Sequence, residues 1–223
     1  DFDYIIANSF ATKRQFPLNK NLFCVYNAID VHHFDLPVIS LEGSLKVGMI
    51  SNNSQRKGLL DFIELSKAAI EEPLLEFFLI GPQNQEVEKI ELELKDSPIP
   101  PKIHFIDYIS ESVKAIAMID VVVNLSMVSE SFGRTIAEGM AARRPVIVYQ
   151  RGAMPELVKH QVTGFLIPPG DLTGVLESLR WLETNRDKAR IMGDTGRHFV
   201  ESTFSSELFQ KNLKGIYEHI LIN

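Results

Sequence analysis

Six short and nearly continuous apolar runs constrain the fold of this 223-residue chain more than any other feature of its sequence. Runs without polar alternation are typical of parallel strands, because helices cover both faces of a parallel sheet. The amphipathic segments between the runs are then crossover helices, so the pattern predicts an α/β fold with a doubly wound parallel sheet. The predicted strands are 45–50, 75–80, 102–106, 121–125, 146–149 and 164–167.

Helices are predicted wherever apolar residues recur with a period close to 3.6. They cover residues 57–70, 86–95, 111–118, 133–142 and 171–183 between the strands, and residues 185–201 and 206–222 at the end of the chain. In a doubly wound sheet, ligands bind beyond the carboxyl ends of the strands. The loops that follow the strands are therefore where functional residues are expected.

The chain is expected to divide into three parts. Residues 1–40 contain two strand-like runs, 3–8 and 22–26, interrupted by prolines, and are interpreted as the remnant of a preceding domain and an interdomain linker. Residues 41–200 form the sheet domain. Residues 201–223 form a helix whose apolar face needs a surface to cover, and we expect it to pack toward a domain that precedes this chain.

Charge and cysteine usage exclude several classes of function. The chain has 23 basic and 29 acidic residues, a net charge of −6, which argues against a nucleic-acid partner because phosphate backbones require a basic surface. Its single cysteine, Cys24, cannot form an intramolecular disulfide and favours a cytoplasmic protein. The sequence has no apolar run long enough to cross a membrane.

The stretch from Ser129 to Met140 follows the fourth predicted strand of the sheet and contains Gly133 where a helix should begin. Free amides at a helix start bind anions, and a glycine lets a phosphate approach closely. Glu130 and Glu138 would flank such an anion, as acceptors for sugar or ribose hydroxyls. Their spacing alone carries little weight, since 18 glutamates in this chain give about 1.5 pairs at that spacing by chance.

In its full context, the segment from Glu130 to Ile147 resembles the E-x7-E block of retaining, nucleotide-sugar-dependent glycosyltransferases of group 1, family 4. These enzymes have the GT-B fold of two Rossmann-like domains, so the resemblance implies that this chain is the C-terminal half of such a fold. Further blocks agree in order along the chain, at residues 25–30 with Phe34, at 48–58, and at 154–158 with 163–171.

The resemblance also implies roles for individual residues. Glu130 would contact hydroxyls of the donor sugar, and Lys57 would neutralise the departing diphosphate, which makes these two the catalytic candidates. Glu138 would bind the ribose diol. No metal and no other cofactor is implied, beyond the nucleoside-diphosphate sugar itself. The remaining donor-binding candidates are Arg56, Phe132, Gly133, Arg134 and Thr135.

Two positions depart from the family pattern. The family usually has an arginine five or six residues before the lysine, where this chain has Asn52 and Ser51. Either Arg56 supplies part of the missing charge, or the diphosphate is stabilised less than usual. Arg143 stands where a glycine is common, a change that affects the end of a helix.

The function implied is a hexosyltransferase-like activity of the polysaccharide-biosynthesis type, which transfers sugar with retention to a carbohydrate or lipid-linked acceptor. The acceptor would bind in the N-terminal domain, so the chain by itself is expected to be inactive. Two alternatives stay open, a non-catalytic nucleotide-sugar-binding or assembly module and a GT-B-fold sugar-nucleotide epimerase. Peripheral association of the full protein with the inner face of the membrane, and self-association through the last helix, stay open as well.

Overall fold

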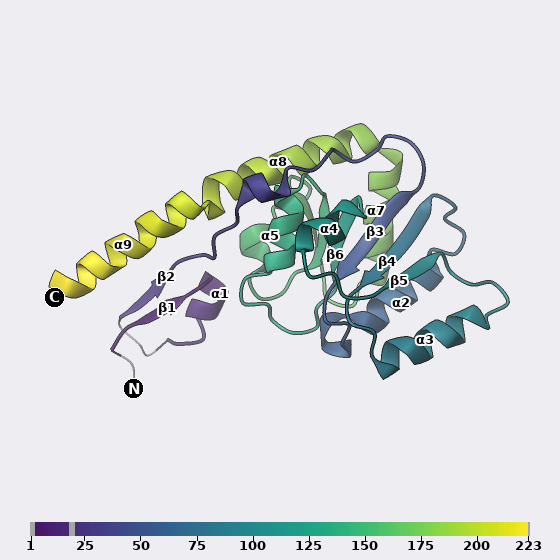
Figure 1. Cartoon of the computed structure of the whole chain (residues 1–223), viewed down its shortest axis with the longest axis horizontal. Helices are drawn as coiled ribbons and strands as arrows, with labels where there is room; N and C mark the ends of the chain where they lie inside the picture. The colour runs from purple at the N-terminus through teal and green to yellow at the C-terminus, as the bar shows by residue number, and fades with distance from the viewer. Residues whose placement is uncertain (1–2, 18–20, 223) are drawn as a thin grey trace.

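The computed structural model of the chain describes residues 3–17 and 21–222, and its centre is a six-stranded parallel sheet (Figure 1). The strand order is β5-β4-β3-β6-β7-β8, which confirms the doubly wound sheet. All four residues of β7, an interior strand, are buried, as the continuous apolar run predicted. The strands are β3 (Leu45–Ile50), β4 (Leu75–Ile80), β5 (Ile103–Ile106), β6 (Val121–Asn124), β7 (Val146–Tyr149) and β8 (Gly164–Ile167).

Helices cover both faces of this sheet and bury two separate apolar clusters. One cluster packs α2 (Leu59–Ala68), α3 (Gln85–Lys95) and α7 (Leu172–Thr184) on one face. The other packs α4 (Ser112–Ala117), α5 (Arg134–Ala141) and α6 (Met154–Leu157) on the opposite face. The long helix α8 (Arg186–Phe204) contributes to both clusters and so closes one side of the domain. The short helix α6 was missed by the sequence periodicity.

The segment before α2 differs from the prediction of one helix over residues 57–70. Gln55–Lys57 form a 3-10 turn, η2, and Gly58 follows with φ +87° before α2 begins at Leu59. A Cβ atom at position 58 would lie 2.2 Å from the carbonyl oxygen of Leu125, so only glycine fits there. The turn keeps Lys57 out of the helix, at the carboxyl end of the sheet.

The N-terminal part forms a small unit of its own beside the sheet domain. Strands β1 (Ile5–Ala7) and β2 (Leu22–Cys24) pair in parallel, and the four-residue helix α1 (Phe10–Lys13), which the sequence pattern did not predict, lies between them in the chain. Both strands are shorter than the expected runs 3–8 and 22–26. Residues 1–2 and 18–20 of the expected 1–40 segment lie outside the described part of the chain.

A segment without regular secondary structure, residues 35–44, leads from this unit into β3 and has no strand partner in the described structure. Its 3-10 turn η1 (Val31–Phe34) precedes it. Unpaired backbone carbonyls need other donors, and here guanidinium groups of α8 and of the segment after α5 provide them. The bonds run from Arg197 to Phe34 (3.3 Å), Arg144 to Pro37 (2.7 Å), Arg190 to Ile39 (2.9 Å) and Arg186 to Gly43 (3.0 Å).

Arg143, at a position where the family that the sequence resembles commonly has glycine, has the left-handed conformation that favours glycine, with φ +58°. Its guanidinium donates to Asp35 at 2.8 Å and lies 3.3 Å from a carboxylate oxygen of Asp194. The hydrogen bond from Arg143 is the main cause of a lowered pKa at Asp35. Backbone strain at such a residue costs about 1–2 kcal/mol when it has a side chain.

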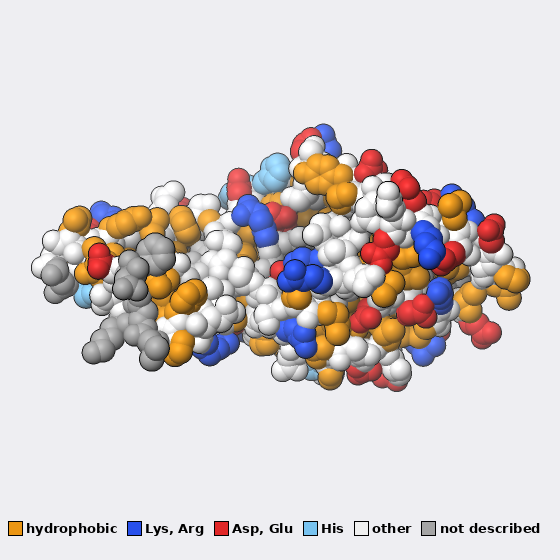
Figure 2. All heavy atoms as spheres, turned by 90° about the horizontal axis from the view of Figure 1, so that it is seen from below, with side chains coloured by type: hydrophobic (Ala, Val, Ile, Leu, Met, Phe, Trp, Pro, Cys, Tyr) orange, Lys and Arg blue, Asp and Glu red, His pale blue; other side chains and the backbone are white. Residues whose placement is uncertain are grey.

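The last helix, α9 (Ser206–Ile222), continues past α8 and lies beside the β1–β2 pair, where His219 contacts the ring of Phe23 (Figure 1). The break from α8 falls at Ser205, and α9 has the bounds of the helix predicted over residues 206–222. None of the described residues of α9 is buried. Apolar side chains gather at this end of the molecule (Figure 2). No helix among the described residues is long and apolar enough to span a membrane.

Candidate functional site

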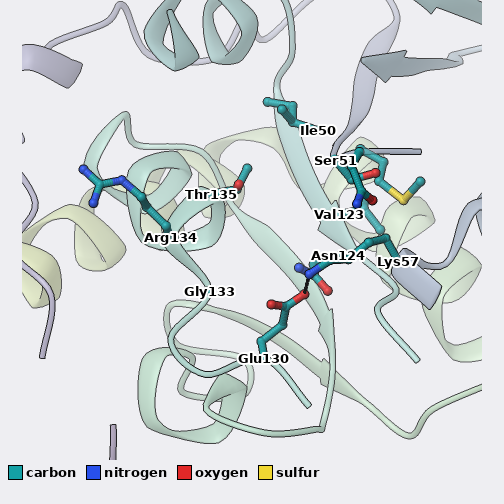
Figure 3. A pocket seen from close by; sticks show the side chains of 11 residues that line it. Ile50, Ser51, Lys57, Val123, Asn124, Glu130, Gly133, Arg134 and Thr135 are labelled. Carbon is teal, nitrogen blue, oxygen red and sulfur yellow. Dashed lines mark hydrogen bonds and ion pairs between the residues drawn. The ribbon is translucent and has the colours of Figure 1, made fainter. Parts of the chain in front are cut away.

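A cavity of about 310 Å³ opens at the carboxyl ends of β3 and β6 (Figure 3). These two strands pair with each other, and the chain turns outward from them in opposite directions, with β4 and β5 on one side and β7 and β8 on the other. This is the topological switch point at which open α/β sheets bind ligands. The loops after β3 and β6, where functional residues were predicted, therefore border this cavity.

Lys57 and Glu130 lie in this cavity and point toward each other, although 73 residues separate them in the chain (Figure 3). The Nζ atom of Lys57 donates to Oε1 of Glu130 at 2.6 Å, and the two side chains are 32% and 18% exposed. Lys57 reaches the site from the turn after β3, and Glu130 from the loop after β6. The structure thus brings the two catalytic candidates together as an ion pair.

The start of α5 forms another wall of the cavity, with Gly133, Arg134 and Thr135 in its lining. Gly133 is the N-cap, with φ +90°, and supplies no side-chain acceptor to the first turn. The first amides of a helix have no partner within the helix, and the helix dipole makes them favourable for an anion. The side chain of Arg134 points away from the Lys57–Glu130 pair (Figure 3).

Ser51 and Asn52, the positions that usually include an arginine in the family, also line the cavity. Their side chains are neutral and are engaged locally: Ser51 Oγ donates to Asn53 at 3.2 Å, and Asn52 accepts from Ser54 at 2.9 Å. The departure seen in the sequence therefore lies inside the site. Among the described residues that line the cavity, the cationic side chains are those of Lys57 and Arg134.

Three other candidates lie outside the lining. Arg56 is exposed, and its backbone carbonyl accepts from the amide of Met127 at 3.0 Å. Phe132 is 2% exposed and packs in the core. Glu138 is buried on α5 and accepts from Nε of Arg134 at 2.9 Å. Their roles toward a ligand stay predictions.

Sequence reasoning missed the apolar and amide part of the lining. Met49 and Ile50 end β3, and Val123 and Asn124 end β6. These residues could have been predicted only from the strand order. A residue at the carboxyl end of a strand lines the cavity when that strand borders the switch point. Within the described parts of the chain, no group of three His, Cys, Asp or Glu residues could hold a metal ion.

The chain is similar to known proteins in sequence and in fold. N-acetyl-alpha-D-glucosaminyl L-malate synthase of Bacillus anthracis is 28% identical over 211 residues, which is 91% of this chain and 55% of that protein. A glycosyltransferase from Rickettsia africae matches 99% of this chain and 64% of its own, with 21% identity and a TM-score of 0.85. Anabaena HepE, solved with UDP and glucose, matches 97% and 63% with 20% identity and a TM-score of 0.83.

This chain thus spans about half the length of the relative from Bacillus anthracis and about two thirds of the two solved proteins. Its fold is that of part of a GT-B glycosyltransferase. A family model described as glycosyl transferases group 1 matches residues 38–199, which contain the whole six-stranded sheet and every residue of the cavity. The chain belongs to the group 1 family of glycosyl transferases.

Proposed function

We propose that this chain is the donor-binding half of an enzyme that transfers a glycosyl unit from a nucleoside-diphosphate sugar to an acceptor hydroxyl with retention of configuration. One observation carries the proposal: the cavity at the switch point is bordered by Lys57 on one side and by the uncapped start of α5 on another. A cation and a set of free amides are the groups that a diphosphate needs.

In this proposal, catalysis is mainly stabilisation of charge on the departing diphosphate. Lys57 and the amides at the start of α5 hold that charge, while Glu130 accepts hydrogen bonds from sugar hydroxyls. The Nζ atom of Lys57 lies 2.6 Å from Oε1 of Glu130, so this role requires donor binding to redirect Nζ from the carboxylate to the diphosphate. Glu138 would bind the ribose, after release of its contact with Arg134.

We assign residues 41–200 to donor binding, residues 1–40 to the connection with an acceptor-binding half, and the C-terminal helix to packing against that half. The exposed apolar side chains on α9 support the last assignment, among them Tyr217 at 54% and Leu221 at 85%. The acceptor, a carbohydrate or lipid-linked molecule, would bind outside this chain. Proximity of donor and acceptor supplies about 7–11 kcal/mol of barrier reduction, so this chain by itself should bind donor but transfer no sugar.

Thermal unfolding with UDP and with GDP tests the binding site. A nucleoside diphosphate at 100 times its dissociation constant adds about 2.7 kcal/mol to the stability. For a chain of this size that corresponds to a rise of about 5–10 °C in the unfolding temperature. The rise should disappear in Lys57→Met, which removes the charge but keeps the length of the side chain. No shift with either nucleotide in the unmodified chain would contradict the proposal.

A non-catalytic nucleotide-sugar-binding module is the second candidate, and the neutral pair Ser51 and Asn52 in the cavity favours it. A module of this kind would bind the nucleotide sugar but leave the glycosidic bond intact. Incubation of the full-length protein with UDP-glucose or GDP-mannose distinguishes the two functions. Release of free sugar or transfer to an acceptor supports the enzyme, and binding without turnover supports the module.

A further inference from the structure

The carboxylate of Glu156 binds three groups of the N-terminal unit, a role that the sequence pattern did not predict. It lies on α6, and its side chain is 13% exposed. Its Oε1 atom accepts from the amide of Ala11 at 2.6 Å, and Oε2 accepts from the amide of Phe10 at 2.9 Å. Oε2 also accepts from the hydroxyl of Tyr26 at 2.9 Å. One carboxylate therefore holds the start of α1 and a residue beyond β2 against the sheet domain.

The unit that Glu156 holds is in direct contact with the loop that carries Glu130. The neighbouring residue on that loop, Ser131, accepts through Oγ from Nδ2 of Asn8 at 3.3 Å. Its carbonyl accepts from the hydroxyl of Thr12 at 3.4 Å. Asn8 and Thr12 flank the amides that Glu156 binds, so a displacement of α1 would move both donors away from the loop.

The opposite side of the loop is tied to the start of α6. The amide of Ala153, the N-cap of α6, donates to the carbonyl of Glu130 at 2.9 Å. The contacts therefore form a closed ring, from the Glu130 loop through Ala153 to Glu156, then through α1 to Thr12 and back to Ser131. Within this ring, Glu156 and Ser131 are the two residues of the sheet domain that bind the N-terminal unit, and Glu156 makes the shorter hydrogen bonds.

Aromatic contacts of Tyr26 add to this ring of hydrogen bonds. The ring of Tyr26 lies 6.3 Å from that of Phe132, the residue between Ser131 and the helix start, and 5.1 Å from that of Phe204. Burial, followed by the hydrogen bond to Glu156, raises the pKa of Tyr26 well above its ordinary value. The hydroxyl of Tyr26 therefore keeps its proton, and remains a donor to Glu156, beyond the pH at which a tyrosine ordinarily titrates.

From these contacts we propose that Glu156 is a positioning residue of the donor site: it fixes the Glu130–Ser131 loop in register with the N-terminal unit. The functional part rests on the proposed donor role of Glu130. On that basis, Glu156 couples the position of Glu130 to the chain segment that leads toward the acceptor-binding half. Loss of this coupling should impair recognition of the sugar and leave the diphosphate contacts of Lys57 and α5 in place.

The first test measures loop order in Glu156→Gln, since an amide cannot accept from two backbone amides and a hydroxyl at once. We expect NMR order parameters of the amides of residues 129–133 to fall from the rigid value of about 0.85 toward 0.6. Glu72→Gln is the matched control, because Glu72 also binds a partner element, through Arg180 of α7 at 2.7 Å, but precedes β4 at the other end of the sheet. Loop order should not change in that control.

The second test compares UDP with UDP-glucose by calorimetry in the same variants. Glu156→Gln should weaken UDP-glucose about tenfold relative to UDP, which corresponds to 1.4 kcal/mol. A purely structural anchor would change both affinities equally. Should Glu156→Gln not fold, Tyr26→Phe, which removes one of the three bonds, should show the same two changes to a smaller degree.

Unchanged order of residues 129–133 in a folded Glu156→Gln or Tyr26→Phe protein would overturn the proposal. An unchanged ratio of the UDP and UDP-glucose affinities would overturn its functional part. Failure of UDP to bind any variant, the unmodified chain included, would instead count against the proposed function. Because loop order is measured without nucleotide, the two failures are distinguishable.

Discussion

The ion pair between Lys57 and Glu130 predicts that removal of a carboxylate should strengthen nucleotide binding. Nζ and Oε1 are 2.6 Å apart, and both side chains are more than half buried, at 32% and 18% exposed. A hydrogen bond between charged groups in such a setting contributes about 1.5–3 kcal/mol, against at most about 1 kcal/mol for a fully exposed pair. If the diphosphate takes over Lys57, this free energy is lost on binding.

Glu130→Gln should therefore lower the dissociation constant for UDP about tenfold, a gain of roughly 1.4 kcal/mol. The gain stays below the full value of the ion pair because a glutamine amide can still accept one hydrogen bond from Lys57. Removal of the carboxylate also removes its repulsion of the diphosphate, which acts in the same direction. For UDP-glucose the gain should be smaller or reversed, since the sugar loses a charged acceptor.

Isothermal titration calorimetry at low ionic strength measures the change. Glu64→Gln provides the matched control, because Glu64 forms an exposed ion pair with Lys67 at 2.8 Å on α2, outside the cavity. In a Lys57→Met background, Glu130→Gln should give only the smaller gain from reduced repulsion. The reasoning would be refuted if Glu130→Gln weakened UDP binding, or if its effect equalled that of Glu64→Gln.

Three further predictions follow from single contacts. Glu138→Gln should raise the dissociation constant for UDP about tenfold in calorimetry, because a charged acceptor for the ribose is lost; an unchanged constant would return Glu138 to a structural role. Gly58→Ala should lower the free energy of unfolding, measured in urea, by more than about 2 kcal/mol, because the new Cβ would lie 2.2 Å from a backbone carbonyl oxygen and alanine is strained at positive φ. Gly170→Ala is the control, since Gly170 has positive φ but open space around it, and should lower the free energy of unfolding clearly less. Burial and the hydrogen bond to Asp61 at 2.5 Å raise the pKa of Tyr149, so the stability that this residue contributes is present below the unfolded pKa of about 10 and is lost as the pH rises above it. The loss is up to about 1.4 kcal/mol of unfolding free energy per pH unit. Tyr149→Phe should flatten this alkaline decline in the free energy of unfolding, and an equally steep decline would contradict the assignment.

The sequence by itself determined the strands and the longer helices of the sheet domain. The run Val146–Tyr149 is apolar throughout because β7 is covered on both faces, and that composition is visible without the fold. Gly133 marked the start of α5 because few other residues can adopt the conformation with φ +90°. The shorter elements were not predicted, because a four-residue helix such as α6 is too short to show a helical period in its apolar residues.

Only the tertiary structure decided which elements are neighbours. Strands that are apolar on both faces carry no alternation that could fix their order, so the sequence did not reveal that β3 pairs with β6. That pairing places Lys57 against Glu130, and with them the cavity at the switch point. The contacts of Glu156 with α1 join residues about 145 positions apart, through backbone amides that carry no sequence signal, because every residue except proline has one.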